Sequence, residues 1–191
     1  MIFEEDTISS ERIYEGKILN LRRDIVHVHS GQESFREIVE HNGGVAIAAV
    51  TKEGKMVLVR QYRKAAGKVL LEVPAGKIEK GEEDHLLLAA VRELKEETGY
   101  TAGQMTFMNF FYTSVGYSTE IIYLYFAENL SPGETNFDEH EAIETEEYGI
   151  EELKEMIGAG AICDAKTISA ILLTEQRLTA YRTETGIVNC P

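Results

Sequence analysis

The hydrophobic and polar positions near the N-terminus predict a small antiparallel β unit. Apolar and polar residues alternate over residues 25–29 and again over 35–39, and residues 30–32 between them have the Ser-Gly-Gln composition of a turn. The Gly43-Gly44 pair then ends the pattern. Because a few strands alone bury little apolar surface, we expect residues 1–43 to form a dimerisation arm that packs on the main domain or on a second chain.

The rest of the chain, residues 44–191, is expected to form the main domain. Strand patterns cover residues 45–50, 56–62, 69–73, 105–112 and 121–127. Helical periodicity runs over residues 84–98, and two more helices are predicted over 150–157 and 165–178. A single helix among the strands, with more helices at the end, does not follow regular βαβα alternation. The pattern therefore predicts an α/β sandwich around a mixed sheet.

Composition and charge narrow the class of partner. The 191 residues are 43% hydrophobic and 27% charged, which indicates a folded globular protein. Asp and Glu outnumber Lys and Arg by 33 to 19, and the resulting net charge of −14 repels nucleic acid and acidic membrane surfaces. A phosphate-bearing ligand would therefore need a metal ion or a few well-placed arginines.

The cysteines and the N-terminal residues favour a cytoplasmic protein. Cys163 and Cys190 are the only two cysteines, and neither has a partner at metal-ligand spacing. The first residues lack a basic segment followed by an apolar run, and no stretch reaches about 18 apolar residues. We therefore expect neither a disulfide scaffold nor a zinc site. A reducing compartment fits this cysteine content.

The acidic helix predicted over residues 84–98 is the segment richest in candidate chemistry. Glu93 and Glu97 are four residues apart, so their side chains lie about 40° apart around the helix and about 6 Å apart along it. Neighbouring carboxylates repel each other unless a cation lies between them, and oxygen ligands suit Mg²⁺ or Mn²⁺. Glu96 can add a ligand, and Arg92 can brace Glu96. The alternative is a solvated charged face, which is common on glutamate-rich helices.

This helix and the residues before it resemble the Nudix box, whose pattern is G-x5-E-x7-R-E-U-x-E-E-x-G-U, with U a bulky or aliphatic residue. The matching residues are Gly76, Glu82, Arg92, Glu93, Leu94, Glu96, Glu97, Gly99 and Tyr100. Nine residues rather than seven separate Glu82 from Arg92, so we expect a two-residue insertion, with either Glu82 or Asp84 in the first glutamate position. The resemblance implies the α/β/α sandwich of Nudix proteins, with a mixed β-sheet, plus the small N-terminal antiparallel β unit.

Beyond the box, nearly the whole chain is similar to the ADP-ribose pyrophosphatase branch of Nudix hydrolases. The similar segments are residues 35–39, 59–63, 71–76, 112–117 and 164–167. One departure is Val115, which stands where this branch usually carries a proline. That departure keeps open a nucleoside diphosphate derivative other than ADP-ribose as the substrate.

The resemblance also implies which residues hold the metal and catalyse the reaction. The implied metal ligands are the carbonyl of Ala75 and the carboxylates of Glu93, Glu96 and Glu97. Glu141, in the acidic loop after the last long strand, is the implied general base, and Glu97 is the second catalytic residue. The alternatives for the base are a loop that only solubilises the protein, or one of the residues Glu120, Glu139 and Glu144.

Three further residues are implied to bind the substrate. Arg63 would clamp a phosphate, because a guanidinium offers a bidentate fork to phosphate oxygens. Arg36 would reach the nucleotide from the arm, and Glu72 would accept hydrogen bonds from adenine or ribose groups. An ordinary salt bridge is the alternative for each of the three.

The resemblance as a whole predicts a Mg²⁺-dependent pyrophosphatase that splits ADP-ribose into AMP and ribose 5-phosphate. Mn²⁺ would substitute for Mg²⁺, and the arm would form a homodimer. One alternative is a pyrophosphatase for another nucleoside diphosphate sugar. The other is a non-catalytic nucleotide sensor, although this chain keeps the box carboxylates Glu93, Glu96 and Glu97 and lacks a basic helical extension.

Overall fold

The structure of the protein is a computed structural model that describes residues 3–82, 84–135 and 143–185, with side chains described up to residue 180. The chain divides into two compact units, with boundaries after Gly43, Phe110 and Ile122. Unit 1 contains the N-terminal sheet and residues 111–122, and unit 2 contains the rest of the described chain. Unit 1 is therefore larger than the arm of residues 1–43 predicted from the sequence.

Unit 1 is built on a three-stranded antiparallel sheet. Its strands follow the order β1 (Asp6–Glu15), β2 (Asn20–His27) and β3 (Glu33–Glu40). Residues 111–122 join β3 through backbone hydrogen bonds, from Val39 N to Tyr117 O at 2.7 Å and from Thr119 N to Val39 O at 3.0 Å. The sequence did not predict β1, because this strand is exposed along its whole length and therefore shows no buried face.

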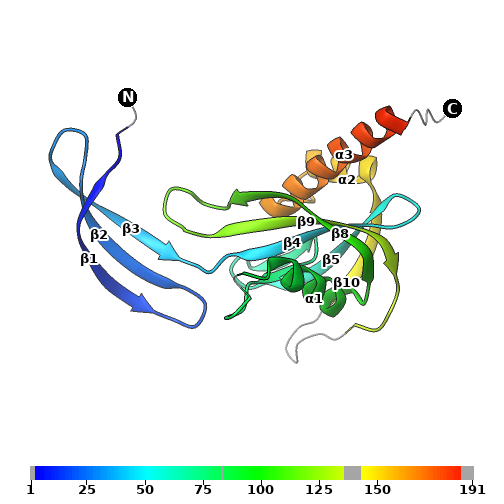
Figure 1. The fold of residues 1–191 in the computed structure, drawn as a ribbon, viewed down its shortest axis with the longest axis horizontal. Helices are drawn as coiled ribbons and strands as arrows, with labels where there is room; N and C mark the ends of the chain where they lie inside the picture. The colour runs from blue at the N-terminus through cyan, green and yellow to red at the C-terminus, as the bar shows by residue number, and fades with distance from the viewer. Residues whose placement is uncertain (1–2, 83, 136–142, 186–191) are drawn as a thin grey trace. The chain divides into compact units, whose positions relative to one another are not determined.

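Unit 2 is built on a seven-stranded sheet with helices on both faces (Figure 1). The main path of the sheet is β10 (Ile143–Gly149), β5 (Lys55–Arg63), β4 (Gly44–Val50), β9 (Ile121–Ser131) and β8 (Thr101–Tyr112). Two short strands lie off this path, with β6 (Lys68–Glu72) paired to β5 and β7 (Ala75–Lys77) paired to β4. The sandwich fold predicted from the sequence is confirmed.

The strand β4 lies at the centre of the core. All of its residues are buried, because α1 (Leu86–Thr98) and α3 (Ala165–Thr185) both pack against it. Its side chains Val45 and Ile47 belong to one apolar cluster with Ala90 and Leu94 of α1. A strand covered on both faces is a continuous apolar run, which is why it could be predicted from the sequence.

The strands β7 and β10 were not predicted. The sequence of β10 looks like part of an acidic loop, yet residues 143–149 pair antiparallel with β5 at the edge of the sheet. Most of β10 is not buried, so polar residues are compatible with it. An ion pair between Arg60 Nε and Glu146 Oε1, at 2.6 Å, links the two strands. The sequence of β10 does not alternate between apolar and polar residues, and strand prediction depends on this alternation.

The helix α1 ends at Thr98, the predicted last residue, and Gly99 caps it. Gly99 adopts φ 73°, and its N–H donates to Lys95 O at 2.9 Å. A Cβ atom here would lie 2.6 Å from Gly133 O, so both the backbone conformation and the close approach require glycine.

Two helices follow the sheet, α2 (Ile150–Gly158) and α3. The helix α3 extends beyond the predicted end at residue 178, and Asp164 caps it, with Thr167 N donating to Asp164 Oδ2 at 3.0 Å. None of the described helices has the length and apolar character needed to span a membrane.

Candidate active site

The chain changes its strand partner immediately before the predicted box. Glu72 is the last residue of β6, which pairs with β5, and Ala75 is the first residue of β7, which pairs with β4. The carbonyl of Pro74, between them, accepts a hydrogen bond from Ile47 N at 2.8 Å. This crossing places the Ala75-Gly76 backbone beside the central strand.

Two carboxylates of α1 face this crossing. A Cβ atom on Gly76 would lie 1.9 Å from Glu93 Oε1, so the absence of a side chain makes room for the Glu93 carboxylate. Glu97 Oε2 accepts a hydrogen bond from Ala75 N at 3.0 Å, and Glu97 is only 4% exposed. The four-residue spacing of the two glutamates thus puts both carboxylates against the same two residues of β7.

Arg92 holds the acidic face of α1 together. Its Nη1 lies 2.8 Å from Glu93 Oε1 and 2.9 Å from Glu96 Oε2, and its Nε and Nη2 contact both carboxylate oxygens of Glu82. The hydrogen bond with Glu82 has the largest effect among these contacts and raises the pKa of Arg92. The same hydrogen bond lowers the pKa of Glu82. Glu82 rather than Asp84 therefore occupies the acidic position that faces Arg92.

Three of the four predicted metal ligands lie together. Ala75, Glu93 and Glu97 share the β7 crossing, and Glu96 is linked to Glu93 through Arg92. Carboxylate and carbonyl oxygens are the donors that hard divalent cations prefer, so the chemistry of the set fits such an ion. Within the described ranges no three acidic, histidine or cysteine residues form a ready cation site.

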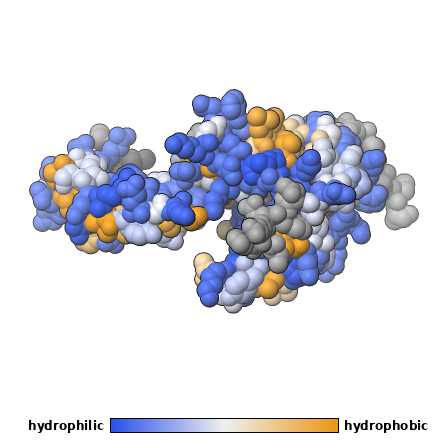
Figure 2. Space-filling view, turned by 90° about the horizontal axis from the view of Figure 1, so that it is seen from below, coloured by the Kyte–Doolittle hydropathy of each residue, from blue (hydrophilic) through white to orange (hydrophobic). Residues whose placement is uncertain are grey.

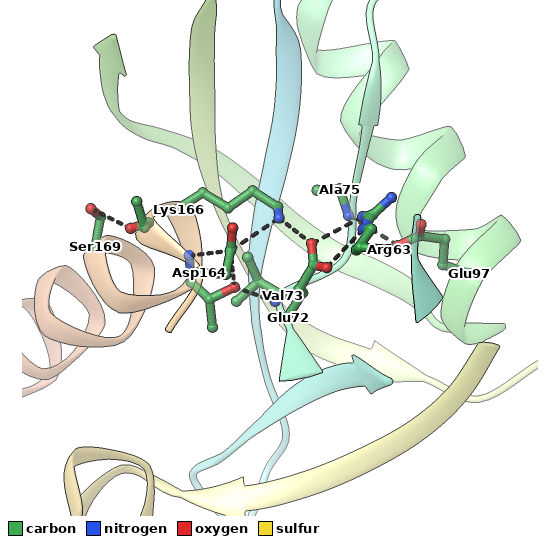
Figure 3. Close-up of polar contacts among 10 residues, drawn as sticks. Arg63, Glu72, Val73, Ala75, Glu97, Asp164, Lys166 and Ser169 are labelled. Carbon is green, nitrogen blue, oxygen red and sulfur yellow. Dashed lines mark hydrogen bonds and ion pairs between the residues drawn. The ribbon is translucent and has the colours of Figure 1, made fainter. Parts of the chain in front are cut away.

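Arg63 and Glu72, both predicted to bind substrate, pair with each other (Figure 3). Arg63 Nε lies 2.7 Å from Glu72 Oε1, and Nη2 lies 2.9 Å from Oε2. Glu72 is 1% exposed, and its burial raises the pKa, but the Arg63 hydrogen bonds and the positive charge of Lys166 outweigh burial and lower it overall. Glu72 is therefore a buried carboxylate that carries its charge.

Arg36, the third predicted substrate residue, lies in unit 1. Its Nε donates to Glu5 Oε2 at 2.9 Å, and both residues line a pocket of about 370 Å³. The pocket is also lined by Arg22, Ile38 and residues 115–119. Val115, the residue in place of the usual proline, is 80% exposed there.

The predicted general base Glu141 lies outside the described residues, as does the alternative Glu139. Glu120, another alternative, belongs to unit 1, where Thr113 Oγ1 donates to its Oε2 at 2.6 Å. Glu144 lies in β10 and is exposed.

Sequence reasoning assigned no role to Lys166, whose Nζ contacts Glu72 Oε2 and lies 3.0 Å from Asp164 Oδ2. The sequence signal that could have pointed to Lys166 is the similarity of residues 164–167 to the ADP-ribose pyrophosphatase branch of Nudix hydrolases.

Comparison with known proteins shows which family the chain resembles. Residues 40–171 match the NUDIX domain, and residues 5–39 match the nucleoside diphosphate sugar hydrolase N-terminal domain. The chain is 45% identical over 170 residues to an ADP-ribose pyrophosphatase of Bacillus subtilis (strain 168), which covers 88% of this chain and 91% of the relative. It is also 45% identical over 172 residues to a methanol dehydrogenase activator of Bacillus methanolicus, over 89% of this chain and 92% of the relative.

A solved structure described as an ADP compounds hydrolase shares the fold. Its TM-score is 0.83 at 20% sequence identity, over 95% of this chain and 97% of that one. The fold, the carboxylates at the β7 crossing and the matches define the class of the protein, which is a hydrolase of the pyrophosphate bond in nucleoside diphosphate derivatives. The chain belongs to the Nudix family, whose hydrolases generally use divalent metal ions.

Proposed function

We propose that this protein is a cytoplasmic, Mg²⁺-dependent pyrophosphatase that hydrolyses ADP-ribose to AMP and ribose 5-phosphate. The observation that carries the proposal is the β7 crossing, where the Glu93 and Glu97 carboxylates lie against Ala75 and Gly76. The Bacillus subtilis relative, which carries that activity in its name, supports this choice of substrate.

The charges of protein and substrate explain why a cation is needed. The chain has a net charge of −14, and a pyrophosphate bridge is itself anionic, so local positive charge must overcome a repulsive field. Ala75 O and the carboxylates of Glu93, Glu96 and Glu97 would hold Mg²⁺, for which Mn²⁺ would substitute. A bound divalent ion neutralises phosphate charge and lowers the pKa of its water.

Arg63 would supply the second local positive charge. Glu72 accepts hydrogen bonds from its Nε and Nη2, and Nη1 has no hydrogen-bond acceptor among the described residues. A guanidinium has five N–H groups, so the fork can still bind phosphate oxygens while it remains paired to Glu72. Glu72 of unit 2 and Arg36 of unit 1 remain the two residues that the family resemblance predicts to contact the nucleoside.

The reaction also needs a base that takes the proton of the attacking water. We assign this role to Glu141, which belongs to the acidic stretch of the sequence between β9 and β10. Glu141→Gln would lower kcat, and the loss would shrink as the pH rises if hydroxide replaces the missing base.

The test is a substrate panel with purified protein and Mg²⁺. The panel contains ADP-ribose, ADP-glucose, GDP-mannose, NADH and diadenosine polyphosphates, and the products are identified by chromatography. We expect the highest kcat/KM with ADP-ribose, and AMP plus ribose 5-phosphate as products. Another nucleoside diphosphate sugar is the second candidate, favoured by Val115, and a higher kcat/KM with GDP-mannose would establish it.

The same panel tests a non-catalytic role. One of the two relatives is named for activating a dehydrogenase rather than for a cleavage. Binding of ADP-ribose without hydrolysis of any compound, with Mg²⁺ or with Mn²⁺, would overturn the pyrophosphatase proposal and favour a nucleotide sensor.

We also propose that the protein is a homodimer that associates through its N-terminal sheet. Apolar patches lie among hydrophilic residues on the surface of this unit (Figure 2). The large apolar side chains exposed in this unit include Ile8, Ile13, Tyr14, Ile18 and Phe35. So many apolar groups on a small sheet are typical of a surface that a partner covers.

A further inference from the structure

Glu72 is a single buried carboxylate shared by two cations. Arg63 donates to both of its oxygens, and Lys166 Nζ donates to Oε2, the oxygen that also receives Arg63 Nη2. The side chain of Glu72 is 2% exposed, that of Lys166 is 14% exposed, and that of Arg63 is 39% exposed. Arg63 is thus the only one of the three that reaches well into solvent, on the side of Ala75 and Glu97 (Figure 3).

The start of α3 fixes Lys166 in place. Lys166 Nζ lies 3.0 Å from Asp164 Oδ2, and the same oxygen accepts hydrogen bonds from Thr167 N at 3.0 Å and Thr167 Oγ1 at 2.6 Å. Thr167 Oγ1 in turn accepts the N–H of Val73 at 2.9 Å. The helix therefore anchors both the ammonium that reaches Glu72 and the backbone next to Glu72.

The charges alternate along this chain of contacts. They run from Asp164 through Lys166 and Glu72 to Arg63. A buried carboxylate must be compensated, because leaving it unpaired is costly. If Arg63 were the sole partner of Glu72, the guanidinium alone would have to neutralise the buried carboxylate. An anionic ligand would then compete with Glu72 for this guanidinium. With Lys166 also present, Arg63 keeps part of its charge for a ligand.

We propose that Lys166 is a positioning residue for Arg63. It acts through Glu72, without contact with the substrate, and sets both the orientation of the Arg63 guanidinium and its attraction for the anionic pyrophosphate. This inference rests on the proposed function, because it requires that Arg63 bind the substrate. A purely structural Lys166 would only stabilise the fold, so the two roles differ in what they do to KM.

The test compares Lys166→Met with Lys154→Met. Lys154 is a matched control, since its ammonium also bridges two carboxylates, Glu151 and Glu175, on α2 and α3. In Lys166→Met we expect the KM for ADP-ribose to rise about tenfold with kcat changed less than about threefold. Lys154→Met should leave both constants within about twofold of the wild type. The conservative Lys166→Arg should restore KM to within about threefold.

Direct binding provides a readout that does not depend on turnover. Calorimetric titration of ADP-ribose into the chain carrying Glu97→Gln should show the same rise in Kd when Lys166→Met is added. A fall in melting temperature with KM and Kd unchanged would overturn the proposal, because it would leave Lys166 a structural role only.

A second pair of variants covers the case in which Lys166→Met does not fold. Glu72→Gln removes the buried charge, so adding Lys166→Met to it should leave KM within about twofold of the Glu72→Gln value. A further rise would show that Lys166 acts on the substrate directly and would overturn the role assigned here. Wild-type protein that neither binds nor cleaves nucleotide sugars would overturn the proposed function together with this inference. An active wild type whose Lys166 variants keep the same KM and Kd would overturn this inference alone.

Discussion

At the residue scale, we expect catalysis to depend on the charge of one nearly buried carboxylate, that of Glu97. Glu97 accepts the Ala75 N–H and lies against β7. Glu97→Gln keeps the size and an acceptor oxygen but removes the charge, so we expect kcat to fall at least about 100-fold with Mg²⁺ saturating. The free energy of unfolding should change by less than about 1 kcal/mol.

The control for that prediction is Glu151→Gln on α2, whose side chain is 80% exposed and which should be neutral in both measurements. Steady-state kinetics and urea unfolding measure the two quantities. Near wild-type turnover in Glu97→Gln would show that Glu97 is neither a metal ligand nor a catalytic residue.

Only part of the site could be predicted from individual residues. The helical spacing of Glu93 and Glu97 placed both on one face, because helix geometry is local. The shared contact of Glu72 with Lys166 joins residues 94 positions apart, and no local pattern encodes such a contact. The choice between Glu82 and Asp84 likewise needed the structure, since either residue can precede the helix and only the fold brings one of them to Arg92.

At the scale of elements, one buried hydroxyl of α3 helps to hold the residue that follows β6, in addition to the contact of Lys166 with Glu72. Thr167 is fully buried, and its Oγ1 accepts the Val73 N–H. Thr167→Val would leave this N–H without its acceptor and should reduce the free energy of unfolding by about 1–3 kcal/mol. Thr167→Ser should retain most of the stability.

Urea unfolding followed by far-ultraviolet circular dichroism measures this effect, since the chain contains no Trp. Ser169→Ala is the control, because the Ser169 hydroxyl makes an exposed hydrogen bond within its own helix, to Ala165 O at 2.8 Å. Equal stability of the Thr167→Val variant and the wild type would show that this hydrogen bond does not hold the two elements together.

The edge strand β10 makes the stability depend on pH. Hydrogen bonds from Arg60 and Tyr148 lower the pKa of Glu146 below its ordinary value of 4.5. A lowered pKa contributes stability that is present above pH 4.5 and is lost as the pH falls through the folded-state value. We expect Glu146→Gln to cost up to about 1 kcal/mol at pH 7, because the pair is partly exposed and screened by solvent.

Below the folded-state pKa the wild type and Glu146→Gln should unfold with the same free energy. Urea unfolding at pH 7 and at a series of lower pH values provides the comparison, and the difference between the two proteins should shrink as the pH falls below 4.5. A difference that persists unchanged in acid would show that Glu146 stabilises β10 by something other than its charge.

Burial explains which elements could be predicted. The strand β4 is buried on both faces and has a continuous apolar sequence, so it was predicted within about two residues of its ends. The strands β1 and β10 lie at sheet edges, and their polar residues face solvent, which leaves no alternation to detect. Their pairing is set by the neighbouring strand rather than by their own sequence.

At the scale of the whole molecule, the proposed homodimer follows from the exposed apolar surface of unit 1. Sedimentation equilibrium should give twice the 21.4 kDa mass of one chain. Ile13→Glu puts a charge on β1, where Ile13 is 46% exposed, and should shift the protein toward the single-chain mass. Leu172→Glu on α3, where Leu172 is 48% exposed, is the matched control and should remain dimeric. Wild-type protein that sediments as a single chain would contradict the proposal.

The contact of α3 with Val73 and Glu72 bears on the order in which the protein is completed during synthesis. Residues 76–100 carry the whole box, yet Val73 N finds its acceptor in Thr167, and Glu72 finds its second cationic partner, beside Arg63, in Lys166. A nascent chain on the ribosome will therefore have exposed the entire motif long before those partners emerge. The ability to bind nucleotide should appear late in translation, and chains released before residue 164 should be inactive and prone to proteolysis.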